Sequence, residues 1–146
     1  MRPIFHWPVR VYYEDTDTGG VVFYANYLKF FERARTEWLR AAGIEQQALA
    51  EKNAVMFVVK STAIDYHAPA KLDDFLKITV GLEKLGSASV RFKQEAWRTG
   101  VSEPLRLCSS SIRVGCVDIK SLRPTAIPAA VLEKLATDIK TVEPVL

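Results

Sequence analysis

The sequence holds few of the residues from which metal centres and disulfide frameworks are built. It has two cysteines and two histidines in 146 residues. Cys108 and Cys116 fall in one predicted strand, where their separation is too large for a disulfide bond. His6 and His67 complete no metal-ligand spacing with either cysteine. We therefore expect two buried thiols, no disulfide and no metal.

Long apolar runs and runs of one charge are also missing. No stretch approaches the about eighteen apolar residues of a membrane-spanning helix, and the first residues lack the apolar core of a signal peptide. Lysine and arginine total 20 and aspartate and glutamate 17, which gives a net charge of +3. This excess is too small and too dispersed to indicate nucleic-acid binding. We expect a cytoplasmic protein that neither inserts into membranes nor binds nucleic acids.

The remaining composition is that of an ordinary globular protein. Apolar residues make up 49% and charged residues 25% of the chain, as in soluble globular domains. A length of 146 residues suits one domain, which we assign to residues 1–146. Val9, Val11 and Tyr13 alternate with other residues and predict a first strand.

A long helix is predicted directly after this strand. Asn26 is a favoured N-cap, and Gly43 can adopt the left-handed conformation that ends a helix. On the polar side, Arg33 and Glu37 are spaced to form a surface pair. The apolar residues of this segment fall on one helical face: Tyr27, Phe30, Phe31, Ala34, Trp38, Ala41 and Ala42.

The pattern changes to that of strands after residue 54. Residues 55–65, 75–85, 88–98 and 105–117 are predicted strands, of which 75–85 shows the clearest period of two. Residues 45–52 and 128–140 are predicted helices, the second with Pro128 near its first position. One long helix and an antiparallel sheet define an α+β fold of two layers.

The segment between the first strand and the long helix carries the chemistry that we favour. Asp15 and Asp17 precede a helix N-terminus, where unpaired N–H groups stabilise negative charge. The alternative is that these acids only form a turn or a cap. Tyr13 and Tyr24 add hydroxyl groups that can donate to a carboxylate or an oxyanion, or else lie at a core boundary.

Other catalytic arrangements have little support in the sequence. No nucleophile elbow, phosphate loop or dinucleotide-binding motif is present. Ser109, Ser110 and Ser111 have no histidine nearby in the sequence. His67 is a weaker candidate for a general base, because a loop histidine beside proline is more often structural. Hydrolysis or proton transfer by a carboxylate remains.

Three segments together resemble the YbgC family of acyl-CoA thioesterases, which is associated with Tol–Pal operons. They are Trp7–Val22, Tyr27–Leu28 together with Phe31–Glu37, and Tyr66–Asp74. They are also similar to 4-hydroxybenzoyl-CoA thioesterase. The resemblance implies a hotdog fold, in which a five-stranded antiparallel β-sheet wraps a long central helix. It further implies a homodimer or homotetramer that acts on acyl-CoA without a cofactor, since coenzyme A is part of the substrate.

The resemblance also implies roles for individual residues. The second aspartate of the motif, Asp17 here, is the catalytic carboxylate, either as nucleophile or as the base that activates water. Tyr13 and Tyr24 complete the catalytic group. Backbone N–H groups near Tyr24 hold the carbonyl oxygen, with Val22 and Phe23 as substrate contacts.

Two basic residues, Lys60 and Arg91, are the candidates for binding the phosphates of coenzyme A. In this family the phosphates are frequently bound across a subunit interface. One departure from the family concerns Tyr24, because many YbgC members have histidine there. The related 4-hydroxybenzoyl-CoA enzyme has tyrosine, so the change bears on acyl preference rather than on activity.

Three functions are consistent with the sequence. The first is acyl-CoA thioester hydrolysis. The second is a non-catalytic partner in envelope or lipid metabolism that binds acyl-CoA or acyl carrier protein. A hydratase on the same fold is a third and weaker reading. The acyl group, and whether coenzyme A or acyl carrier protein bears it, stay open.

Overall fold

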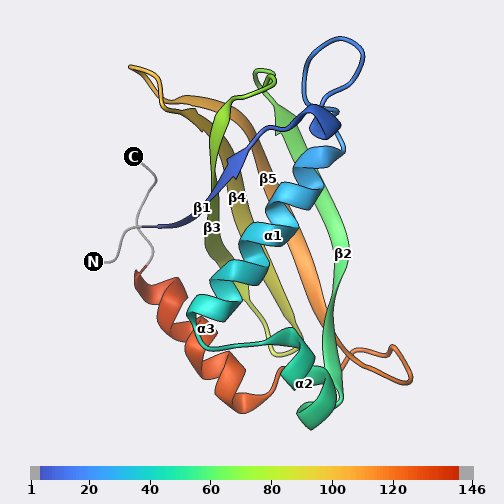
Figure 1. The fold of residues 1–146 in the computed structure, drawn as a ribbon. Helices are drawn as coiled ribbons and strands as arrows, with labels where there is room; N and C mark the ends of the chain where they lie inside the picture. Colours follow the sequence, from blue (N-terminus) through green and yellow to red (C-terminus); the bar gives the residue numbers. More distant parts are fainter. Residues whose placement is uncertain (1–3, 142–146) are drawn as a thin grey trace.

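A computed structural model describes residues 4–141 of the chain (Figure 1). The strands are β1 (Phe5–Arg10), β2 (Val55–Tyr66), β3 (Phe75–Leu85), β4 (Ser89–Thr99) and β5 (Leu105–Asp118). The helices are α1 (Asn26–Ala41), α2 (Gln46–Asn53) and α3 (Ala129–Thr141), with a 3₁₀ turn at Tyr13–Asp15. These bounds agree with the predicted elements to within a few residues.

All five strands form one antiparallel sheet in the order β1-β3-β4-β5-β2. Strands β3, β4 and β5 are consecutive in sequence and adjacent in space, because the short segments after Leu85 and Thr99 connect neighbouring antiparallel strands. Strand β2 lies beside β5 and forms one edge, and β1 forms the other. The α+β class and the five-stranded antiparallel sheet are therefore confirmed.

Helix α1 crosses one face of the sheet (Figure 1) and packs its apolar side against it. The Trp38 ring meets the Phe92 ring of β4 edge-on, with centroids 5.6 Å apart. On the same face, the buried Gln94 side chain donates to the carbonyl oxygens of Phe31 and Thr79. The Gln94 amide thus links the helix to the sheet, and its own buried polar atoms are hydrogen-bonded, as buried polar groups usually are.

The end of α1 is as predicted, whereas its start differs in detail. Gly43 has a φ of +80°, and the Ile44 N–H donates to the Leu39 carbonyl oxygen at 2.8 Å, as expected for a glycine that ends a helix. The predicted N-cap, Asn26, is instead the first helical residue. Its side-chain amide donates to the Asp15 carbonyl oxygen at 2.8 Å, so it ties the helix to the preceding loop.

Two further predictions are corrected. Strand β1 ends at Arg10, and Tyr13 lies in the 3₁₀ turn, because the Val11 N–H donates to the Asp74 carbonyl oxygen outside any strand. Glu37 pairs with Arg40 at 2.7 Å, one helical turn on, rather than with Arg33.

Both cysteines are free and buried in β5, as predicted. Burial raises the pKa of the Cys108 thiol to about 12. None of the helices within residues 4–141 has the length and apolar character needed to cross a membrane.

Candidate active site

Asp17 lies in a tight turn between the 3₁₀ turn and α1. Its Oδ1 atom accepts a hydrogen bond from the Gly19 N–H at 2.8 Å and a longer one from the Val21 N–H at 3.4 Å. The Asp17 N–H donates to the Val21 carbonyl oxygen at 2.9 Å. One carboxylate oxygen of Asp17 therefore forms a turn, which the sequence offered as the alternative to a catalytic role. The other, Oδ2, receives no hydrogen bond from any residue in the described range 4–141.

Asp15 serves the backbone instead. Its Oδ2 atom accepts from the Tyr12 N–H at 2.8 Å. Its carbonyl oxygen accepts from the Phe23 N–H at 3.0 Å and from the Asn26 side chain. The Asp15 carboxylate thus closes the 3₁₀ turn, and its carbonyl oxygen ties that turn to the start of α1.

The turn that leads into α1 contains two N–H groups that have no acceptor. The Val22 N–H donates to the Ala70 carbonyl oxygen, and the Phe23 N–H to Asp15. The N–H groups of Tyr24 and Ala25, which come next, donate to no acceptor in the part of the chain that is described. Because they lie at the positive end of a 16-residue helix, they suit a negatively charged oxygen.

The predicted aromatic side chains gather only in part. The rings of Phe23 and Tyr24 are 4.8 Å apart, and Tyr66 of β2 meets Tyr24 edge-on at 6.3 Å. The Tyr66 hydroxyl also donates to the Tyr24 carbonyl oxygen at 3.0 Å. Tyr13, by contrast, is 83% exposed. The contribution of Tyr66 was missed because it lies 42 residues from Tyr24.

Val22 and His67, two other residues that the sequence offered for the site, have contacts within the fold, as does Tyr27. The Val22 side chain is buried in the core, so Val22 meets a ligand less readily than the half-exposed Phe23. Tyr27, deeper in the helix, accepts from the Ala70 N–H, and burial raises its pKa to about 12. The His67 ring contacts Ser109 at 3.0 Å, which agrees with the structural interpretation of this histidine.

A second group of charged residues, the basic row, crosses the sheet near the β3–β4 hairpin. It consists of Lys84, Arg91 and Arg113, which stand opposite one another on three adjacent strands. A cavity of about 120 Å³ is lined by these three residues with Gly86 and Ser89. No described carboxylate forms an ion pair with any of the three. Like charges placed opposite one another destabilise a sheet, so the row favours an anion.

Lys60 lies on the same face as the basic row. A Cβ atom at Gly115 would come within 2.7 Å of the Lys60 side chain, so the lysine stem covers this glycine. Gly115 stands opposite Ser89 and is two residues from Arg113, which puts all of them on one face. Lys60 and Arg91, which were predicted together as phosphate-binding residues, thus lie on the same face of the sheet.

The basic row and the Asp17 turn are well separated within one chain. Tyr66, which contacts Tyr24, stands opposite Cys108, and Arg113 is five residues further along β5. Five residues of strand span about 17 Å. A ligand that uses both regions of the same chain would need to be long.

A long helix that crosses one face of a five-stranded antiparallel sheet places this chain in the class of thioesterase-like proteins. The family model of the thioesterase-like superfamily matches residues 11–135. A probable thioesterase from Bartonella henselae has a similar structure, with a TM-score of 0.78 and 30% identity, covering 86% of this chain and 99% of that one.

Curated relatives narrow the family further. The chain is 47% identical to the acyl-CoA thioesterase YbgC of Haemophilus influenzae, over 87% of this chain and 90% of the relative. It is 44% identical to the acyl-CoA thioester hydrolase YbgC of Escherichia coli O157:H7, over 88% and 93%. The chain belongs to the YbgC family of acyl-CoA thioesterases, as its motifs predict.

Proposed function

We propose that this protein hydrolyses acyl-CoA thioesters with Asp17 as its catalytic carboxylate. The observation that carries the proposal is the Asp17 carboxylate, oriented by the Gly19 N–H in the segment that leads into α1, where the Tyr24 and Ala25 N–H groups donate to no described acceptor. The turn holds one carboxylate oxygen in place and leaves the other without a donor from the described residues. This suits a group that must be oriented and still react.

In the proposed reaction, Asp17 either adds to the thioester carbonyl carbon or takes a proton from a water molecule that adds. Negative charge then develops on the carbonyl oxygen in both cases. The Tyr24 and Ala25 amides stabilise this charge as preorganised donors at the helix N-terminus. When the tetrahedral intermediate collapses, the carbon–sulfur bond breaks and coenzyme A leaves as a thiolate. If water was the nucleophile, the free acid forms at once and Asp17 gives its proton to the thiolate. If Asp17 was the nucleophile, the acyl group remains on Asp17 as a mixed anhydride, which a water molecule then hydrolyses to release the acid and restore the carboxylate. No cofactor or metal takes part.

The phosphates of coenzyme A are assigned to the basic row together with Lys60. Three cations in register around a small cavity favour a polyphosphate. About 17 Å of strand separates the row from Tyr66. We therefore assign the two sites that one substrate occupies to two subunits. The basic row of one subunit binds the phosphates, and the Asp17 turn of another subunit hydrolyses the thioester. The catalytic unit is then a homodimer, or a homotetramer built from dimers.

The edge of β2 supports this assembly. Its residues 59–63 are exposed, and the Val59 side chain remains 53% exposed. An edge strand presents unpaired backbone groups and is a template for a further strand. We therefore place the dimer interface along β2. Sedimentation velocity tests this arrangement, because a monomer at assay concentration would contradict the dimer.

A panel of acyl-CoA thioesters tests the function. Short aliphatic, long aliphatic and aromatic acyl-CoAs are given to the wild-type protein and to Tyr24→His, and thiol release is followed. Hydrolysis of at least one substrate, with a preference that shifts in Tyr24→His, is the expected result. Saturable binding without thiol release from any substrate would indicate a non-catalytic acyl-CoA binder instead.

The same panel on acyl carrier protein identifies the carrier. If the basic row binds the nucleotide part of coenzyme A, the KM for acyl-CoA is lower than the KM for the same acyl group on the pantetheine arm of acyl carrier protein. Equal KM values for the two would show that the row has no part in binding.

A further inference from the structure

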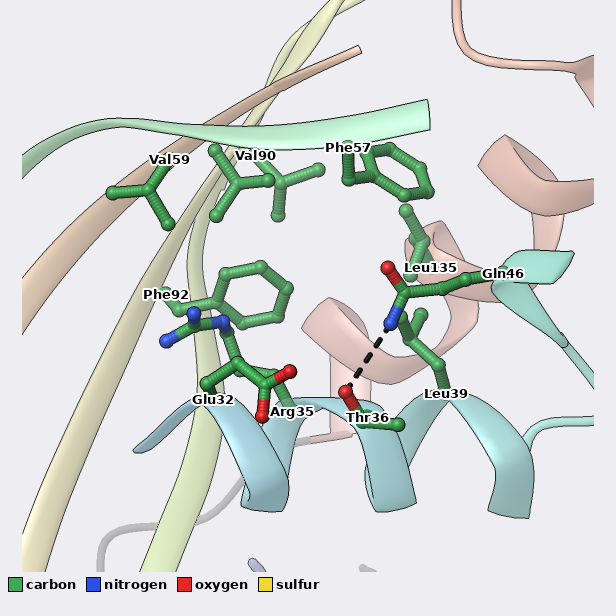
Figure 2. A pocket seen from close by; sticks show the side chains of 11 residues that line it. Glu32, Arg35, Thr36, Leu39, Gln46, Phe57, Val59, Val90, Phe92 and Leu135 are labelled. Carbon is green, nitrogen blue, oxygen red and sulfur yellow. Dashed lines mark hydrogen bonds between the residues drawn. The ribbon is translucent and has the colours of Figure 1, made fainter. Parts of the chain in front are cut away.

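The first turn of α1 and the middle of this helix contact different parts of the fold. Arg35 and Leu39, from the middle, line a cavity between α1 and the sheet (Figure 2). Tyr27, from the first turn, has a buried side chain whose hydroxyl accepts a hydrogen bond from the Ala70 N–H at 3.2 Å. Ala70 lies between β2 and β3. This contact therefore joins the start of the helix to a connecting segment.

The segment around Ala70 offers few other backbone donors to hold it in place. Pro69 has no N–H group, and the Lys71 N–H donates within the segment, to the Asp74 side chain at 2.9 Å. Among residues 4–141, the Tyr27 hydroxyl is the one acceptor of the Ala70 N–H. The hydroxyl of Tyr27 therefore fixes the amide side of Ala70.

The carbonyl side of Ala70 holds the turn that leads into α1. It accepts from the Val22 N–H at 2.8 Å, and the residues next to these two form an antiparallel bridge. The N–H groups of Tyr24 and Ala25, which have no described acceptor, come directly after this turn in the chain. One chain of hydrogen bonds thus runs from the Tyr27 hydroxyl through Ala70 to the residues that precede the two amides.

We propose that Tyr27 is a positioning residue for thioester hydrolysis. Its hydroxyl holds Ala70, and Ala70 holds Val22, so that the Tyr24 and Ala25 N–H groups keep a fixed direction. This inference rests on the proposed function, because it takes these two amides as the donors to the thioester oxygen. Such donors stabilise developing charge only if they are already in place, and a displacement of about 1 Å lowers the rate strongly.

The Tyr27 side chain is suited to this role because its ring is held on two sides. The ring lies 5.7 Å from that of Tyr66 and 6.0 Å from that of Phe30, measured between centroids. Burial raises the pKa of Tyr27 to about 12, so the hydroxyl stays neutral at the pH of an assay. Tyr66 also donates to the Tyr24 carbonyl oxygen. Two tyrosines from different elements therefore hold the same turn.

The variant Tyr27→Phe tests the proposal, because it removes the hydroxyl and keeps the ring. The Ala70 N–H is then buried without an acceptor, which costs free energy and favours a shift of the segment. For the best acyl-CoA, kcat should fall about tenfold and KM should stay within about twofold, since the amides act on charge that develops only in the transition state. Wild-type kcat, or a rise in KM alone, would overturn the proposal.

Thr79→Val is the matched control. The Thr79 hydroxyl is also buried and also accepts from a backbone N–H, that of Glu95 at 2.9 Å, but it lies in the middle of β3. Thermal unfolding should show a similar loss of stability in Thr79→Val and Tyr27→Phe, whereas Thr79→Val should keep the wild-type kcat. An equal fall of kcat in both variants would mean that lost stability lowers turnover, and Tyr27 would have no positioning role.

Hydrogen exchange on the wild-type protein keeps the test decisive if Tyr27→Phe is too unstable to assay. The Ala70 and Val22 N–H groups should be protected to a similar degree, because one chain of hydrogen bonds holds both. Exchange of the Ala70 N–H at the rate of an exposed amide would overturn the proposal.

Asp17→Asn separates this inference from the proposed function. Near wild-type turnover in Asp17→Asn would remove the function on which the inference rests. Lost turnover in Asp17→Asn, together with wild-type kcat in Tyr27→Phe, would leave the function in place and overturn the role of Tyr27 alone.

Discussion

The start of α1 and the basic row differ in what holds their functional groups in place. At the start of α1 the groups that we propose to react are set by backbone hydrogen bonds: the Gly19 N–H fixes Asp17, and Asp15 fixes the loop. In the basic row, long side chains project from register positions and meet no described carboxylate. The first region is held by backbone hydrogen bonds to two carboxylates, and the second is positioned by strand register and carries three cations.

This difference predicts different responses to mutation. A site built from one oriented carboxylate and two amides should fail completely when its carboxylate is neutralised. A site built from summed charge should weaken in steps and should respond to salt. The predictions below use this contrast.

The largest expected effect is that of Asp17→Asn. It removes the charge that attacks the thioester or activates water, and turnover should fall by about 1,000-fold or more. Thiol release with the best acyl-CoA measures it. Asp15→Asn is the matched control, because an amide oxygen still accepts from the Tyr12 N–H, and it should stay within a few-fold of wild type. Near wild-type turnover in Asp17→Asn would remove Asp17 as the catalytic group.

The double variant Arg91→Ala with Arg113→Ala should have the next largest effect. We expect KM for acyl-CoA to rise about tenfold with little change in kcat, because the lost charges bind phosphate far from the reacting bond. The increase should shrink in about 1 M salt, where the Debye length falls to about 3 Å. Lys29→Ala with Lys52→Ala removes the same charge elsewhere. An equal rise in KM in that control would mean that net charge alone is responsible.

Tyr66→Phe tests how strictly the start of α1 depends on its neighbours. The variant removes the hydroxyl that donates to the Tyr24 carbonyl oxygen and keeps the ring. Turnover should fall by about threefold, the size expected from losing one neutral hydrogen bond of about 0.5–1.5 kcal/mol. Tyr12→Phe alters an exposed hydroxyl and serves as control. If both variants behave alike, the Tyr66 contact does not position Tyr24.

The smallest expected effect is that of Gly115→Ala. The added Cβ displaces the Lys60 stem that covers this position. KM should rise about twofold, in keeping with the small value of a single exposed charge. Lys60→Ala should give the same rise, and combining the two should add nothing further. An additive double variant would show that Gly115 acts by another route.

Much of the fold follows from short-range patterns in the sequence. The alternation in 75–85 predicts the strand, and Gly43 marks the helix end through its own backbone freedom. The half-buried character predicted for that strand is wrong in its middle, where residues 78–82 are all buried, Thr79 among them. Asn26 shows where such rules stop. Its side chain satisfies either the first turn of the helix or a distant carbonyl oxygen, and the fold brings the Asp15 carbonyl within reach.

The sites were predictable to different degrees for the same reason. The Asp17 turn is one continuous segment, so its residues could be assigned together. The basic row joins residues from three strands, and Lys84 and Arg113 gain significance only once the strand register is known. Arg35 looked like one more charge on the long helix. Only the tertiary structure places it beside Gln94, which is 59 residues away in the sequence.

The two buried thiols of β5 have a practical consequence for measuring this enzyme. With the pKa of Cys108 raised to about 12 by burial, almost none of it is thiolate at neutral pH, and Cys116 is buried as well. A disulfide reagent that changes colour on meeting a thiolate will therefore count released coenzyme A and ignore the folded protein. Two additional equivalents per chain would appear on unfolding, so the chain reports its own integrity during the assay.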